Sequence, residues 1–167
     1  MSSSDRRQFL SLLLTLPLVG CGFAPAYGPG APAKALLGKV QADEPGTRDA
    51  FSFVARIEER FGRPQEPTFR LSYQISIQRV DLAVTTAGSI LRYEMVGNVN
   101  WQLIDIATGK VITTGTAQSF TGSAATETTT AAQAAEDDSR LRLMRILADQ
   151  VASKLVATAT NAPPSTP

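Results

Sequence analysis

Two of the residue types that carry most enzyme chemistry are scarce in this chain. Its 167 residues include one cysteine and no histidine. Without histidine there is no imidazole base for a serine or cysteine nucleophile, and the usual histidine-containing zinc sites are excluded. One cysteine cannot form an intramolecular disulfide or a Cys-x-x-Cys pair. We therefore expect no catalytic residues, and a protein that is not an enzyme.

Two acidic clusters are the remaining candidates for catalysis or metal binding. Glu58 and Glu59 are adjacent, but neighbouring helical residues point about 100° apart, so a solvated helix face explains them better than a catalytic pair. Glu136, Asp137 and Asp138 fall in the first half of a predicted helix, where the helix dipole favours negative charge. We expect no metal site here.

The single cysteine, Cys21, follows a short apolar segment at residues 9–19 (FLSLLLTLPLV), which is preceded by Arg6 and Arg7. As a helix this segment would extend about 16 Å, roughly half of a bilayer's hydrocarbon core. Together with Leu18-Val19-Gly20-Cys21 it resembles the signal peptide and lipobox of bacterial lipoproteins, whose cysteine is lipidated before cleavage. This resemblance implies a signal peptide at residues 1–20 and a covalent lipid on Cys21 as the only cofactor-like group.

The export route and the charge of the chain give two further expectations. Asp5-Arg6-Arg7 also resembles a twin-arginine signal, so this route and general secretion both stay open. Removal of residues 1–20 leaves equal numbers of basic and acidic residues. A neutral chain gives no electrostatic reason to expect nucleic acid as a partner.

Composition divides the remainder into three parts. Residues 21–33, which begin at the lipidated cysteine, are rich in proline and glycine and predict a flexible tether. Residues 34–157 form a single predicted domain. Residues 158–167 are small, polar and proline-rich, which predicts a disordered tail.

Hydrophobic periodicity predicts six elements in the domain. A weak strand is expected at residues 35–41, and a helix capped by Thr47 and stopped by Gly62 follows it. Alternating apolar and polar residues predict strands over 69–84 and 91–105, with a return strand over 111–120. Residues 122–135 read as a loop fading into a helix that runs from 134 to 157. The order strand–helix–strand–strand–strand–helix predicts an α+β two-layer sandwich, with two helices packed on one face of a small, mostly antiparallel four-stranded sheet.

The two faces of this sheet differ in composition. Tyr73, Tyr93 and Trp101 alternate in phase with apolar residues, so we expect them in the core rather than on a base-stacking platform. The opposite face is rich in amides and mixed charges, which suit either a polar partner or plain solvent. Both interpretations stay open.

Several stretches resemble the LptE family of lipopolysaccharide-assembly outer-membrane lipoproteins, its alphaproteobacterial members most closely. The resemblance rests on the lipobox followed by an aromatic in residues 21–25 (CGFAP), on LRYEM and WQLID at residues 91–95 and 101–105, on ATGKV at 107–111, and on the closing helix at 135–151. It covers nearly the whole chain.

This resemblance implies a non-enzymatic lipoprotein of the outer membrane. Such proteins plug the LptD β-barrel, help assemble it, and assist transfer of lipopolysaccharide to the outer leaflet. The implied partners are an LptD-type barrel, lipopolysaccharide, and the membrane through the lipid anchor. The implied location is the periplasmic side of the membrane and the barrel lumen. The alternative is a periplasm-facing lipoprotein that binds another ligand or partner.

Their charge alone makes three residues candidate contacts for lipopolysaccharide or the partner: Arg92, Arg79 and Lys110. Some family members carry basic residues at the tip of the first long hairpin. Here the tip at residues 85–89 reads TTAGS and has no basic residue.

Overall fold

The computed structural model describes residues 32–84, 90–124 and 129–161. The predicted signal peptide, Cys21 and the tether up to residue 31 lie outside these ranges. So do the predicted turn at residues 85–89 and residues 162–167 of the predicted tail.

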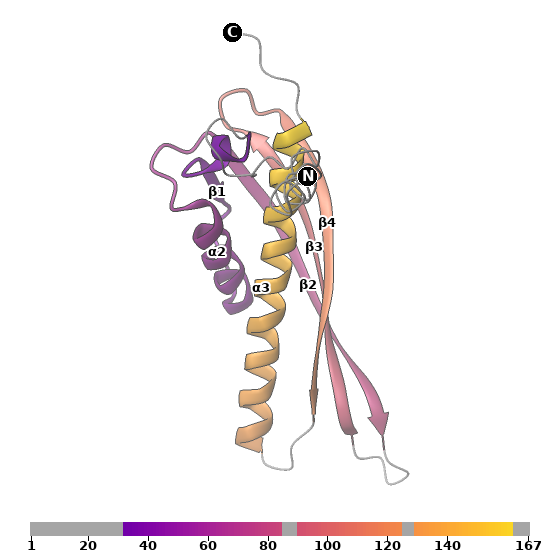
Figure 1. Ribbon diagram of the computed structural model, residues 1–167. Coiled ribbons are helices and arrows are strands. Elements are labelled where there is room, and N and C mark those ends of the chain that lie inside the picture. The colour runs from indigo at the N-terminus through magenta and orange to yellow at the C-terminus, as the bar shows by residue number, and fades with distance from the viewer. Residues whose placement is uncertain (1–31, 85–89, 125–128, 162–167) are drawn as a thin grey trace, which may run out of the picture.

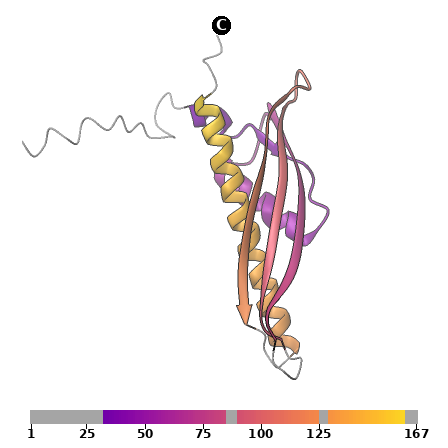
Figure 2. The same cartoon turned by 90° about the vertical axis from the view of Figure 1, so that its right-hand side faces the viewer.

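Two helices cover one face of a four-stranded sheet, which confirms the predicted α+β two-layer sandwich and its element order (Figure 1). Strand β1 (Val40–Ala42) runs parallel to β2 (Phe69–Val84). Strands β3 (Ile90–Asp105) and β4 (Val111–Ala124) complete an antiparallel meander, so the sheet order is β1–β2–β3–β4. In Figure 2 the sheet faces the reader and the helices lie behind it.

Helix α2 (Arg48–Phe61) begins and ends where local chemistry dictates. The Thr47 side chain accepts a hydrogen bond from the backbone N–H of Ala50 at 3.1 Å, which satisfies one of the free amides of the first turn. At the other end Gly62 adopts φ 80° and donates its N–H to the carbonyl of Glu58. A residue with a Cβ would be strained at this φ, so glycine ends the helix.

The β3–β4 connection is fixed by one carboxylate. Asp105 Oδ1 accepts hydrogen bonds from the backbone N–H of Thr108 at 2.8 Å and from its hydroxyl at 2.9 Å. These bonds favour the charged carboxylate and lower the pKa of Asp105 below its ordinary value. Gly109 supplies the positive φ of 69° that completes the turn.

Helix α3 (Thr129–Asn161) is as long as the sheet. Its 33 residues extend about 50 Å. The 16 residues of β2 or β3 cover about the same distance. No helix in the described ranges is long and apolar enough to cross a membrane.

The loop predicted at residues 122–135 is too long at both ends. Strand β4 continues to Ala124 because Arg92 of β3 is still available to pair with it. Helix α3 already begins at Thr129, since the alanine-rich stretch at 131–135 has high helix propensity. The predicted end of this helix at residue 157 is also too early. The helix continues to Asn161, and the Thr158 hydroxyl donates to the carbonyl of Lys154 at 3.0 Å.

The N-terminal boundaries also differ from the prediction. The strand expected at residues 35–41 begins only at Val40, and Pro32–Leu36 form the 3₁₀ helix η2. Residues three apart lie on the same side of a 3₁₀ helix, so Ala33 and Leu36 are buried together. Ala33, assigned above to the tether, is thus part of the packed domain.

The core lies between the helices and the sheet, and it contains Tyr93 and Trp101 as predicted. Tyr73 is partly buried at its margin, with its ring 5.0 Å from that of Phe53 and its hydroxyl donating to the carbonyl of Asp43. Partial burial, with the charge of Asp43, raises the pKa of Tyr73. The largest fully buried side chains come from α2, β2, β3 and α3: Phe53, Ile57, Phe61, Leu71, Met95, Val99, Leu143, Met144, Leu147, Val151 and Leu155.

Candidate functional site

The basic residues nominated by the sequence do not form one cluster. Arg79 and Arg92 lie toward the end of the sheet where β2 finishes and β3 begins, at the bottom of Figure 1. Lys110 lies in the β3–β4 turn at the other end. The strand between Arg92 and Asp105 is about 43 Å long, at 3.3 Å per residue. A single phosphate group therefore cannot contact both Arg92 and Lys110.

Arg79 lies on the side of the sheet that carries the helices and pairs with residues of the same chain, although its side chain is still 41% exposed. Its guanidinium carbon is 4.0 Å from the centre of the Tyr93 ring, a cation–π contact. Its nitrogens pair with Asp81 at 3.1 Å and with Glu136 of α3 at 3.8 Å. Because two carboxylates already offset its charge, Arg79 is a weaker phosphate contact than its charge alone indicates.

Arg92 and Lys110 are exposed cations. Arg92 is opposite Ala83 on one side and Ala124 on the other. Among the described residues neither Arg92 nor Lys110 has an ion-pair partner. Each can therefore meet an anion without breaking an internal contact, one at each end of the sheet.

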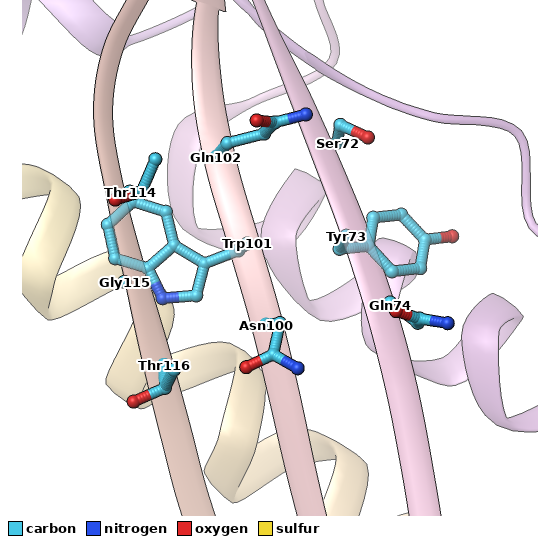
Figure 3. A pocket seen from close by; sticks show the side chains of 9 residues that line it. All are labelled: Ser72, Tyr73, Gln74, Asn100, Trp101, Gln102, Thr114, Gly115 and Thr116. Atoms are coloured by element: carbon cyan, nitrogen blue, oxygen red, sulfur yellow. The ribbon is translucent and has the colours of Figure 1, made fainter.

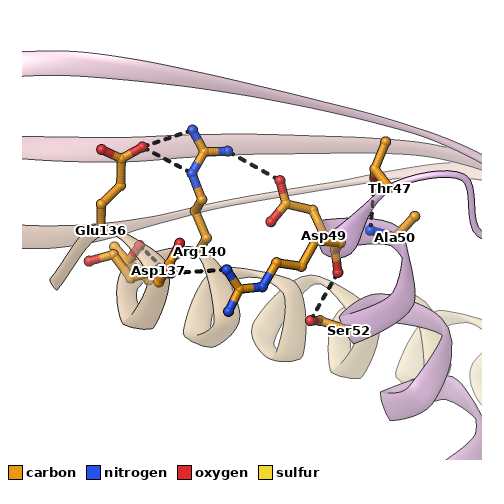
Figure 4. Close-up of polar contacts among 10 residues, drawn as sticks. Thr47, Asp49, Ala50, Ser52, Glu136, Asp137 and Arg140 are labelled. Carbon is orange, nitrogen blue, oxygen red and sulfur yellow. Dashed lines mark hydrogen bonds and ion pairs between the residues drawn. The ribbon is translucent and has the colours of Figure 1, made fainter. Parts of the chain in front are cut away.

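The acidic cluster lies about two turns inside α3, not in its first turn as the helix-dipole interpretation requires, and its carboxylates pair with arginines (Figure 4). Arg140 donates to Glu136 at 3.0 and 3.1 Å and to Asp49 of α2 at 3.1 Å, and Arg48 pairs with Asp137 at 2.9 Å. Burial lowers the pKa of Arg140, but its bonds to Glu136 and Asp49 raise it by more. Within the described part of the chain, no group of three or more acidic residues is arranged so that it could hold a metal ion.

Glu58 and Glu59 are also paired with arginines, each with a different one. Glu58 accepts from Arg63 at 3.2 Å, whereas Glu59 accepts from Arg56 at 2.7 Å. Arg56 also donates two bonds of 3.0 Å to Asp149 of α3, and these raise the pKa of its guanidinium. Sequence reasoning missed these bridges between α2 and α3. A local signal exists only for the pair Glu136–Arg140, whose residues lie one helical turn apart within α3.

The outer face of the sheet, turned away from the helices, is hollowed near its centre (Figure 3). A shallow depression of about 480 Å³ lies among outward-pointing polar side chains. Those side chains are Ser72, Gln74, Asn100, Gln102, Thr114 and Thr116. The depression contains no charged residue, so it suits a neutral polar partner rather than an anion.

Strand β4 carries a large exposed aromatic residue on this outer face. Phe120 is paired with Val96, which is in turn paired with Gln78, whereas Ile112 lies at the register shift beside Leu103 and Ile104. The side chain of Phe120 is 62% exposed. The inward positions of β4 hold small residues instead, including Gly115 and Ala117, and they leave room for α3 and Trp101.

Comparisons with known structures give the same fold at low identity. A lipoprotein of Caulobacter crescentus superposes with a TM-score of 0.67 at 17% identity, covering 78% of this chain and 97% of that one. The rare lipoprotein B of Shewanella oneidensis gives a TM-score of 0.58 at 13% identity, covering 74% and 96%. A minor lipoprotein of Acinetobacter baumannii gives 0.54 at 13%, covering 71% and 89%.

Sequence families give a firmer assignment. No curated protein matches the chain. The family described as "LptE: Lipopolysaccharide-assembly" matches residues 38–155, which is more than half of the chain and includes all four strands and α2. The Caulobacter neighbour agrees with the alphaproteobacterial resemblance of the sequence. The chain belongs to the lipopolysaccharide-assembly family LptE.

Proposed function

We propose that this protein is a non-enzymatic outer-membrane lipoprotein, anchored by a lipid on Cys21. It plugs an LptD-type β-barrel, helps that barrel assemble, and assists transfer of lipopolysaccharide to the outer leaflet. The observation that carries the proposal is the family match over residues 38–155, nearly the whole folded domain. Membership of the family supports a role in lipopolysaccharide assembly. The more specific role as a plug of the barrel is our proposal.

Two physical features support a plug. The lumen of a large outer-membrane barrel is polar, so its occupant needs a hydrophilic surface. Amides and hydroxyls cover the middle of the outer sheet face, and arginine–carboxylate pairs cover much of the helix layer. The ten residues between Cys21 and Pro32 can extend up to about 36 Å, which lets the lipid reach the membrane from the mouth of a barrel.

Co-purification tests the plug role directly. The full-length chain, tagged at its C-terminus and extracted from the envelope with mild detergent, is expected to recover a large outer-membrane barrel that mass spectrometry identifies. A fusion of residues 1–31 to an unrelated soluble domain is the matched control. It carries the same predicted anchor and should recover no barrel. Repeated recovery of the lipoprotein alone would contradict the plug role and favour the alternative binding module.

The lipid anchor has a separate test. Cys21→Ala is expected to abolish incorporation of a fatty-acid probe and to leave residues 1–20 attached, because no thiol remains to be modified before cleavage. Gly22→Ala changes the neighbouring residue without removing the thiol, so it should keep full labelling. Labelling that persists in Cys21→Ala would show that the lipobox assignment is wrong.

A further inference from the structure

The centre of the outer sheet face is an array of amides, which we call the amide face. It consists of Gln74, Gln78, Asn98, Asn100, Gln102 and Gln118, interleaved with Ser72, Ser76, Thr114 and Thr116. The strand registers align these residues in rows across three strands: Ser72–Gln102–Thr114, Gln74–Asn100–Thr116 and Ser76–Asn98–Gln118. No row contains a charged residue, although 19% of the chain is charged.

The amides of this face have unused hydrogen-bonding capacity. None of their side chains forms a hydrogen bond with another described residue of the chain. The side-chain oxygen of Asn98 is shielded from solvent and has no hydrogen-bond partner among the described residues. A buried acceptor without a donor is unfavourable, so the hydrogen bonding of this face is incomplete within the described part of the chain.

An apolar patch continues the amide face toward the free end of the β2–β3 hairpin. The next row of the register is Gln78–Val96–Phe120, and Val80 lies one row further along β2. Phe120 is 62% exposed, Val80 40% and the nearby Leu82 54%. Exposed aromatic side chains beside uncharged polar groups are typical of the centre of a protein interface, where charged residues are depleted.

The surface of the helix layer is more highly charged, although Phe51, Leu141 and Ile146 are also exposed there. Its arginines are mostly engaged with carboxylates of the same chain, as in the pairs Arg48–Asp137, Arg56–Asp149 and Arg140–Asp49. These groups are satisfied in water without a partner. A partner that covered them would have to desolvate several ion pairs, which is costly.

We propose that the amide face and its apolar patch lie against the inner wall of the barrel, with the helix layer turned toward the open lumen. The inference rests on the plug function proposed above and adds its orientation. A barrel wall presents polar side chains at alternate positions of every strand. Amides can both donate and accept, so they match such a wall without a fixed charge pattern. Phe120 is the anchor, and Arg92 and Glu94 lie at the rim.

Photo-crosslinking in the intact envelope tests this orientation. A benzophenone amino acid is placed in the full-length chain at Asn100 or Gln118 on the amide face, and at Phe51 or Arg145 on the helix layer. All of these side chains are exposed and have no hydrogen-bond or ion-pair partner among the described residues, so each variant should fold. The amide-face positions are expected to crosslink to the barrel several-fold more strongly than the helix-layer positions.

A pair of matched substitutions gives an affinity readout. Phe120 and Phe51 are both 62% exposed, one on each layer. Phe120→Asp should weaken recovery of the barrel by roughly 30-fold or more, the effect of losing a hot-spot residue. Phe51→Asp should leave recovery unchanged. Both variants should keep the wild-type melting temperature.

The outcomes separate the two proposals. Failure of the wild-type chain to recover any barrel overturns the plug function itself. If the barrel is recovered but crosslinks form equally from both layers or mainly from Phe51 and Arg145, the plug function stands and the orientation is wrong. An unchanged recovery with Phe120→Asp also overturns the orientation.

Discussion

Phe53→Ala is expected to lower the free energy of unfolding by about 3–5 kcal/mol, the cost of emptying a fully buried aromatic site. The Phe53 side chain is 0% exposed and lies in the main core cluster, with its ring 5.0 Å from that of Tyr73. Phe53 lies between α2 and the sheet, and neighbouring side chains would fill only part of the cavity that its removal leaves. Because small domains have about 5–15 kcal/mol of stability in total, this change removes much of it.

Phe51, two residues earlier on the same helix, is the matched control. It is 62% exposed, so Phe51→Ala should change the free energy of unfolding by no more than about 0.5 kcal/mol. Urea unfolding measures both variants, and the fluorescence of Trp101, the chain's single tryptophan and a buried one, reports the transition. Equal midpoints for the two variants would show that α2 does not present this face to the core.

Local signals in the sequence were enough to place α2 and the long strands. The Thr47 cap and the Gly62 stop act within one turn of the helix, and the alternation from Phe69 onward needs no distant partner. Strand β1 has no such signal. Its three residues become a strand only because β2 offers a parallel edge, with Val40 opposite Phe69 in the sheet.

The candidate surfaces were predictable to different degrees. Alternation alone assigns the amides to the outer face, and it places Arg79 in phase with Leu71 and Tyr73 on the inner one. The pairing of Arg79 with Glu136 depends on how α3 lies across the sheet, which no local pattern encodes. The same holds for Asp49 and Arg140, which are 91 residues apart in the chain.

The small residues on the inner side of β4 have a structural role that the composition of the strand does not reveal. A run of threonine, glycine, alanine and serine reads as featureless, yet these residues face large side chains. Gly115 pairs directly with Trp101 of β3, and the indole lies over the glycine. Close packing of an aromatic ring over a strand glycine compensates for the side chain that the glycine lacks. Featureless stretches beside an aromatic strand therefore carry structural information once the register is known.

Gly115→Ala is accordingly expected to destabilise the protein by about 1–3 kcal/mol through overpacking. An added Cβ would lie 2.5 Å from Cζ2 and 2.9 Å from Cε2 of Trp101. The indole is only 5% exposed, so it cannot swing into solvent without losing its core contacts. Gly122→Ala on the same strand is the control. Its chain neighbours aside, no described atom lies within 4 Å of its added Cβ, and the change should be neutral or stabilising by up to about 1 kcal/mol.

Trp101→Phe provides a test of the mechanism, since phenylalanine lacks the part of the indole that the new Cβ would strike. The indole N–H has no hydrogen-bond partner in the described residues, so its removal breaks no hydrogen bond. In a double-mutant cycle measured by circular dichroism, Gly115→Ala should cost at least about 1 kcal/mol less in the Trp101→Phe background than in the wild type. An equal cost in both backgrounds would mean that backbone conformation, and not the ring, requires glycine at this position. A reduced cost would show that one contact across neighbouring strands sets the residue size at position 115.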